Sequence, residues 1–298
     1  MRLGGKNMSK YEFDSKILSS SHLNFLFGAG INGGAFPQIS GFKKSLKLLK
    51  TLLGEEIDSF EKAIDSLPNK EDKEQVIDEF KKEFVEFSEK IDYSHISIKN
   101  IEKLFSNIQR LVEESENRTK TTKQINIFTL NYDFIVENVL DSLGFLSNSI
   151  SSSNISNHDR FFYMVGYNFS FNKFVPTYLI SKLHGDISNP VLPGNEKYDL
   201  MMQANRFEIL FKMKEKLSRE NSILFVIGYS GYDEHINKIL KDCVSTGLTI
   251  YWFKYKKEDQ IPESLINSVS IIENDNGEDT SLVCANMVSK LWEKSLEE

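Results

Sequence analysis

The chain has 298 residues, a formal net charge of −7 and 40% hydrophobic residues. This length can bury one large core or two smaller ones, and the composition is that of an ordinary globular protein. Surfaces that bind nucleic acids are basic, so the negative charge disfavours such a surface spread over the whole molecule. We therefore expect no direct nucleic-acid partner.

Cysteine usage and the first residues bear on the compartment. Cys243 and Cys284 are the two cysteines of the sequence. Two thiols form neither a disulfide framework nor a four-thiolate zinc site, which favours a reducing compartment. The first residues lack the apolar core of a signal peptide, and no run approaches the roughly 20 apolar residues of a membrane span. We expect a cytoplasmic protein with no membrane association.

Short apolar runs predict buried strands, because they are continuous rather than alternating and end in Gly, Ser or Asn. In chain order they are residues 22–27, 125–130, 178–183, 223–227, 248–253 and 269–272. Helical patterns lie between them, at residues 134–143, 206–217, 234–241 and 279–294. Strands that alternate with helices predict an α/β fold, a Rossmann-like doubly wound parallel sheet.

Two stretches depart from this alternation. Residues 42–118 have helical spacing and no convincing strand, with a turn at Pro68. We predict that they form a helical subdomain inserted into a single domain that spans residues 1–298. Residues 147–174 begin with a Ser- and Asn-rich run, which predicts a surface loop or flap.

Ligands of open α/β sheets bind at the carboxyl ends of the strands, so the segments after the strands are candidate sites. The first segment is GAGINGG, residues 28–34. Its glycines allow a tight turn and let backbone N–H groups approach a pyrophosphate, although many glycine turns bind nothing. A dehydrogenase would place a second strand and a ribose-binding acid about 20 residues later. The helical stretch stands there instead, which disfavours a hydride-transfer enzyme.

The second segment is TLNYD, residues 129–133, after the second predicted strand. Taken alone, this pattern favours Asn131 or Asp133 as the N-cap of the helix that follows. The alternative is a binding role, because an asparagine amide can hold a water molecule or a ribose hydroxyl by donating and accepting together.

The third segment is KLHGD, residues 182–186. A lone histidine is more often structural than catalytic. His184, however, stands at a strand end beside a glycine, and the usual histidine pKa of about 6.5 suits proton transfer at neutral pH. The other histidines, His22, His95, His158 and His235, have no comparable setting.

The fourth segment is GYSGYD, residues 228–233, after a continuous apolar run. Ser230 and Asp233 have the S-x-x-D spacing of a capping box. A small residue before a helix N-terminus is equally suited to bind phosphate or ribose oxygens.

Together, and in this order, the four segments resemble the sirtuin family, and specifically its branch of bacterial NAD-consuming proteins. That pattern has G-A-G after the first strand, then T-x-N-Y-D, then K-x-H-G, then G-Y-S with a nearby acid. The resemblance covers roughly residues 20–255 and implies that NAD is the substrate.

The resemblance also implies a role for each matching residue. Asn131 and His184 would be catalytic, with His184 as the general base or the partner of a ribose hydroxyl. The NAD-binding residues would be Gly28, Ala29, Gly30 and Ile31 at the pyrophosphate and ribose, Asp133 at the nicotinamide side, and Gly228, Ser230 and Asp233 at the adenosine half. Asn32 replaces the serine that is usual in the family, which would retune a phosphate contact. Phe36 matches an apolar residue on the loop over NAD more weakly.

Deacetylating sirtuins carry a four-cysteine zinc module, but no cysteine occurs between His184 and Gly228. We therefore predict hydrolysis of NAD to nicotinamide and ADP-ribose, with no metal. Hydrolases of this branch resemble NAD-depleting effectors of anti-phage defence. That resemblance implies a homo-oligomer and a regulatory partner in trans, of the ATPase or Argonaute type. The alternatives are an NAD- or ADP-ribose-binding regulatory module without turnover and a protein deacylase.

Overall fold

The computed structural model describes residues 18, 20–54, 57, 60–116, 118–119, 122–145, 147–150, 178–187, 204–256, 259, 261–274 and 276–297. These residues build a seven-stranded sheet in the order β3-β4-β2-β1-β5-β6-β7, and every strand pair is parallel. The strands are β1 (His22–Phe27), β2 (Ile125–Thr129), β3 (Ser147–Ile150), β4 (Tyr178–Lys182), β5 (Ser222–Ile227), β6 (Thr249–Phe253) and β7 (Ser270–Ile272). The predicted parallel α/β sheet is confirmed.

Strand β3 corrects one prediction. Its residues, 147–150, fall where a surface loop or flap was expected, yet they pair in parallel with β4 at the edge of the sheet. Serine and asparagine have weak strand propensity, so this strand depends on the backbone hydrogen bonds that β4 offers rather than on its own composition. The rest of the predicted flap, residues 151–174, lies outside the described residues.

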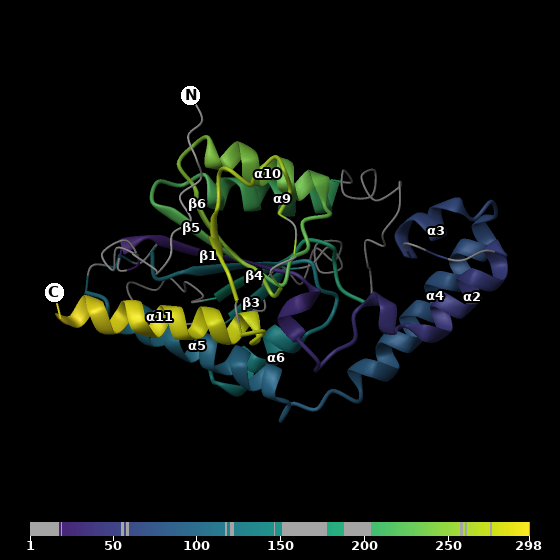
Figure 1. Ribbon diagram of the computed structural model, residues 1–298, viewed down its shortest axis with the longest axis horizontal. Helices are drawn as coiled ribbons and strands as arrows, with labels where there is room; N and C mark the ends of the chain where they lie inside the picture. The colour runs from purple at the N-terminus through teal and green to yellow at the C-terminus, as the bar shows by residue number, and fades with distance from the viewer. Residues whose placement is uncertain are drawn as a thin grey trace.

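The sheet is covered on both faces, which explains why its central strands are mostly apolar and buried. Helices α9 (Ala204–Leu217) and α10 (Glu234–Val244) lie on one face, and α5 (Ile96–Glu114), α6 (Ile135–Ser142) and α11 (Thr280–Glu297) lie on the other (Figure 1). Successive side chains of a strand point to opposite faces. Phe25 accordingly packs in the α5 and α11 cluster, while Leu26 packs in the α9 and α10 cluster.

The helices between β1 and β2 fall into two parts. Helices α2 (Lys43–Leu53), α3 (Phe60–Ser66) and α4 (Lys70–Ser88) project away from the sheet, whereas α5 lies along it beside α11 (Figure 1). We call α2, α3 and α4 the helical arm. The predicted turn at Pro68 separates α3 from α4. Helix α5 therefore serves as the crossover helix of the first βαβ unit, and the arm is the added element.

Aromatic rings hold the helical arm together. The ring centroids of Phe42 and Phe80 are 4.7 Å apart, and those of Phe36 and Phe84 are 4.9 Å apart. A buried carboxylate completes the packing, because Glu83 on α4 accepts hydrogen bonds at the N-terminus of α2. Its donors are Lys44 N (2.9 Å), Ser45 N (2.7 Å) and Ser45 Oγ (2.5 Å). A negative charge is favourable at a helix N-terminus, so Glu83 fixes α2 against α4.

The strand order sets the place where a ligand is expected. From β1 the chain moves to β2, β3 and β4, and it returns on the other side of β1 as β5. The carboxyl ends of β1 and β5 therefore form a topological switch point, the usual ligand position of open α/β sheets. Among the described residues, no helix has the length and apolar character to cross a membrane.

Candidate functional site

The four predicted segments lie side by side at the carboxyl edge of the sheet. Backbone hydrogen bonds extend the ladder past the strand ends, from Leu183 N to Thr129 O (2.8 Å), from Leu130 N to Phe27 O (2.9 Å) and from Gly28 N to Ile227 O (3.1 Å). The first residues of all four turns are consequently held in register. The side chains beyond these first residues then determine which turns contact one another.

The glycine turns after β1 and β5 touch through their backbones. Gly30 N donates to Gly228 O (3.0 Å), and Gly228 has a φ of +67°. A Cβ atom on Gly228 would lie 2.2 Å from Ile31 N, and one on Gly28 would lie 2.4 Å from Gly228 O. Both glycines are required by this contact, because backbone atoms at such distances cannot move aside independently.

Asn32 and Asp133 join the turns after β1 and β2. Both residues are buried, and Asn32 Nδ2 donates to Asp133 Oδ2 over 2.7 Å. The second carboxylate oxygen, Asp133 Oδ1, accepts from Ile135 N in the first turn of α6 (3.0 Å). The predicted N-cap was therefore wrong, because Phe134 rather than Asn131 or Asp133 stands at the N-cap of α6. Asp133 still accepts from the first residue of that helix and also reaches another candidate segment. Asn32 Oδ1 is buried and has no hydrogen-bond partner within the described part of the chain.

A buried lysine supports this pair. Lys182 is 1% exposed, and its Nζ donates to the backbone carbonyl of Asp133 and to Glu137 Oε1 (2.9 Å). It also lies 4.6 Å from the centre of the Phe134 ring, a cation–π distance. Burial raises the pKa of the Asp133 carboxyl above its ordinary value, while the Lys182 charge and the Ile135 and Asn32 hydrogen bonds act in the opposite direction. No role for Lys182 was predicted from the sequence, and its burial is what distinguishes it.

Asn131 faces the first glycine turn. It is buried, its backbone N donates to Thr129 Oγ1 (3.1 Å), and its side-chain Nδ2 donates to Gly28 O (3.3 Å). The amide is therefore held at the boundary between the turns after β2 and β1, next to the switch point.

His184 meets the turn after β5. Its Nε2 lies 3.6 Å from Asp233 Oδ1, and both side chains are largely buried. Strands β4 and β5 are separated by β2 and β1. Three strand spacings amount to about 14 Å, so the turn after β5 crosses the carboxyl ends of the two central strands to bring Asp233 to His184.

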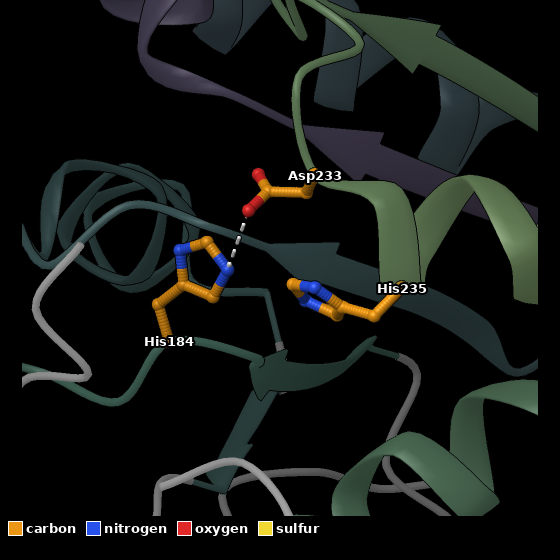
Figure 2. Close-up of side chains that lie close together, drawn as sticks. All are labelled: His184, Asp233 and His235. Atoms are coloured by element: carbon orange, nitrogen blue, oxygen red, sulfur yellow. Dashed lines mark ion pairs between the residues drawn. The ribbon is translucent and has the colours of Figure 1, made fainter. Parts of the chain in front are cut away.

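His235 is a third member of this group, as Figure 2 shows. Its ring centroid lies 6.0 Å from that of His184. The expectation that the other histidines have no comparable setting was therefore wrong for His235. The cause is tertiary, because His235 belongs to α10, and only the crossing of the turn after β5 brings α10 to the end of β4.

Tyr229 and Asn237 brace that turn. Asp233 N donates to Tyr229 Oη (3.2 Å), Tyr229 Oη donates to Asn237 Oδ1 (2.9 Å), and Asn237 Nδ2 donates to Gly231 O (2.7 Å). The Tyr229 ring packs against Trp252 with centroids 5.5 Å apart. Burial raises the pKa of Tyr229, so its hydroxyl stays neutral and continues to donate.

The predicted capping box does not form. Helix α10 begins at Glu234 with Asp233 as its N-cap, and Asp233 makes no side-chain capping hydrogen bond. A capping box would need Ser230 at the N-cap position, three residues before its acid. Ser230 is instead exposed in the turn. The carboxylate of Asp233 is thereby directed to His184 rather than to its own helix.

The remaining predicted site residues lie in different surroundings. Ala29 is exposed in the short 3₁₀ helix Ala29–Asn32, and Ile31 is part of the core. Phe36 is buried among the rings of the helical arm. The structure thus brings Asn131, Asp133, His184 and Asp233 into contacts between segments, whereas Phe36 packs into the arm. Their roles toward NAD remain predictions.

Just under half of the chain is similar to a known protein family. Residues 125–272, which run from the start of β2 to the end of β7, match the family model described as SIR2-like domain. A search of curated protein sequences finds no match. One similar solved structure bears the description "Structural Basis for the Mechanism and Regulation of Sir2 Enzymes". It is 11% identical to this chain, with a TM-score of 0.47, and the match covers 95% of this chain and 97% of that one.

A second solved structure, of a Sir2 homologue in complex with NAD, shares 13% identity, with a TM-score of 0.46 and coverage of 95% and 93%. The second, third and fourth candidate segments all fall within the matched residues, while the first glycine turn precedes them. From β2 to β7 the chain is therefore similar to SIR2-like domains.

Proposed function

We propose that this chain cleaves the nicotinamide–ribose bond of NAD and releases nicotinamide and ADP-ribose. The observation that carries the proposal is the convergence of Asn131 and His184 at the carboxyl edge of the sheet. Asn131 contacts Gly28 at the switch point, and His184 is paired with Asp233 from the far side of it. The SIR2-like match over residues 125–272 supports a nucleotide substrate of this kind.

The proposed reaction needs few groups. The C1′–N bond breaks with its electron pair passing to the pyridinium nitrogen, so nicotinamide leaves as a neutral molecule. The transition state resembles an oxocarbenium ion, as in glycoside hydrolysis. A water oxygen then bonds to C1′, and His184 accepts the proton that this water loses. With Nε2 turned toward Asp233, Nδ1 is the nitrogen that takes the proton, and the Asp233 carboxylate stabilises the imidazolium.

The other buried polar groups have positioning roles in this proposal. Asn131 orients the attacking water or a ribose hydroxyl, because its amide can donate and accept at once. Asn32 Oδ1 offers a buried acceptor. Leaving such an atom without a partner costs about 1–3 kcal/mol, so a donor from the ligand, such as a ribose hydroxyl, would bind there favourably.

The test is incubation of the purified protein with NAD, with quantification of nicotinamide and ADP-ribose. Asn131→Ala and His184→Ala should each lower the rate by roughly 10²–10⁴-fold, the usual range for a positioned catalytic group. His22→Gln is the matched control for His184→Ala. His22 begins β1 at the opposite edge of the sheet, about 17 Å from the end of that strand.

The outcomes separate the alternatives. Tight NAD binding without turnover, in the assembled oligomer and with candidate partners added, would replace the hydrolase with an NAD- or ADP-ribose-binding regulatory module. Release of the acyl group from an acyl-lysine peptide would replace it with a deacylase. Turnover that survives both Asn131→Ala and His184→Ala would show that the proposed site is wrong.

We further propose that NAD cleavage makes this chain an NAD-depleting effector of anti-phage defence. The support is the resemblance to the defence branch, in which activity depends on a homo-oligomer and on an ATPase or Argonaute-type partner in trans. The test is cellular NAD during phage infection. NAD should fall in cells that carry the chain with its neighbouring genes and should persist with His184→Ala. Unchanged NAD in both would contradict this role.

A further inference from the structure

We propose that His184, Asp233 and His235 form a binding site for a divalent transition-metal ion of the zinc class. We propose further that metal bound there inhibits the site, a consequence that rests on the proposed NAD cleavage. His184 comes from the turn after β4, Asp233 from the turn after β5 and His235 from the start of α10, and the three side chains point toward one another (Figure 2). This group differs in kind from a four-cysteine zinc module, since its donors are two imidazoles and one carboxylate.

The geometry suits such an ion. One ligand atom from each residue lies within 4.8 Å of the other two. In a tetrahedral zinc site with bonds of about 2.0–2.1 Å, the ligand atoms lie about 3.3 Å apart. The His184 Nε2 to Asp233 Oδ1 distance is 3.6 Å, so this edge is nearly formed. A movement of the His235 ring nitrogen by on the order of 1–2 Å would complete a three-ligand face.

The chemistry of the donor set points the same way. Neutral imidazole nitrogens and carboxylate oxygens are the ligands of zinc sites that keep a fourth position open. The partial positive charge at the N-terminus of α10 opposes a cation, and the Asp233 carboxylate at that same N-terminus offsets it. The turn that carries Asp233 is held by Tyr229 and Asn237, so the carboxylate is already in place before an ion arrives.

Inhibition follows from the use of His184. A bound ion would occupy His184 Nε2 and the Asp233 carboxylate together, so the contact between these two side chains would be replaced by bonds to the ion. Cleavage of NAD needs no metal, because nicotinamide is already a good leaving group. A bound ion should therefore act as a regulator rather than a cofactor.

The binding test uses tag-free protein that has been stripped with EDTA and then freed of the chelator. Zn²⁺ is titrated by calorimetry, and Co²⁺ is added separately as a spectroscopic probe of the ligands. We expect one equivalent of Zn²⁺ and a Co²⁺ spectrum with imidazole ligands. His235→Ala and Asp233→Asn should each weaken Zn²⁺ binding at least about tenfold, whereas His22→Gln should leave it unchanged. Thermal unfolding of each variant checks that it is folded.

The inhibition test uses the same proteins with NAD. Zn²⁺ should suppress cleavage by the wild type and by His22→Gln, while His235→Ala should stay active at the same Zn²⁺ concentration. An affinity for Zn²⁺ that is unchanged in folded His235→Ala and Asp233→Asn would overturn the site, as would absence of binding to the wild type. Stimulation of cleavage by Zn²⁺ would overturn the inhibitory role. If the metal-free wild type cleaves no NAD as the assembled oligomer with candidate partners added, the proposed function fails while the titration still decides the metal site.

Discussion

The carboxyl edge of the sheet and the helical arm are held together in opposite ways. At the edge, single hydrogen bonds join turns that are far apart in the chain, such as Asn32 to Asp133 and Asn131 to Gly28. In the arm, overlapping aromatic contacts surround each ring, so the loss of one contact leaves others in place. Directional contacts set atomic positions, whereas apolar packing mainly supplies stability. We therefore expect substitutions of the polar side chains at the edge mainly to change activity and substitutions in the arm mainly to change stability.

The two regions meet at Tyr132. This residue stands between Asn131 and Asp133, and its ring makes edge-to-face contacts with Phe80 (6.2 Å) and Phe84 (6.3 Å). The arm therefore supports the backbone that carries two site residues. Substitutions in the arm that spare this contact should separate the two properties most cleanly.

The largest stability effect is expected in the arm. Phe80→Ala removes a buried ring that contacts Phe42, Phe60, Phe84 and Tyr132. Truncation of a buried phenylalanine costs about 3–5 kcal/mol, and a smaller change, Phe80→Leu, keeps much of the apolar volume. Urea denaturation measures both variants. A loss under about 1 kcal/mol for Phe80→Ala would show that the arm contributes little to the stability of the fold.

A comparable effect at the edge should come from a single methyl group. Gly228→Ala places a Cβ atom 2.2 Å from Ile31 N, and residue 228 has a φ of +67°. We therefore expect the free energy of unfolding to fall by about 2–5 kcal/mol and NAD cleavage to be lost. Gly54→Ala, at the end of α2, is the matched control. Its φ is +72° and nothing lies within 4 Å of the added Cβ, so the free energy of unfolding should fall by only about 1–2 kcal/mol. Equal losses at both positions would contradict the contact between the glycine turns.

The buried carboxylate of the arm should have an intermediate effect. Glu83→Ala leaves the first amides of α2 without their acceptor, and we expect a loss of about 2–3 kcal/mol. Glu83→Gln keeps one acceptor oxygen and should lose about half as much. Hydrogen exchange of the α2 amides, together with urea denaturation, measures the change. Unaltered protection of α2 in the alanine variant would show that Glu83 does not hold this helix.

The smallest effect is a pH dependence that arises from Asp133. Burial raises the pKa of its carboxyl above the ordinary 3.8, so the native state binds the proton more tightly than the unfolded state. The stability from this group is therefore present below 3.8 and is lost as the pH rises through the raised native pKa. The free energy of unfolding of the wild type should fall relative to that of Asp133→Asn across this window. If the free energy of unfolding of the wild type instead rose with pH relative to that of Asp133→Asn, the native pKa of Asp133 would be lowered rather than raised.

Much of the fold could be predicted because burial on two faces leaves a direct mark on the sequence. Most positions of β1, β2 and β5 are apolar, and all of their residues except the half-buried His22 are buried. Such a run fits few other environments. Strand β3 leaves no such mark, since it is short, polar and at the edge, where β4 provides its hydrogen bonds.

The sequence predicts which residues stand at the candidate site, but it does not predict which of them contact one another. Glycines and polar residues interrupt the apolar runs at the strand ends, so Asn131 and His184 stand out in the sequence. The same local pattern also predicted a capping box at Ser230, which the structure does not form. Nothing in the pattern around His235 separates it from the other histidines.

The sequence by itself determined the six apolar strands, where those strands end and which turns carry glycine or polar side chains. Only the tertiary structure decided that Asn32 meets Asp133, that Asn131 meets Gly28 and that His184 meets Asp233 and His235. The physical reason is one of range. Backbone preference and burial act on neighbouring residues, whereas these contacts depend on strand order and on a turn that crosses two strand ends.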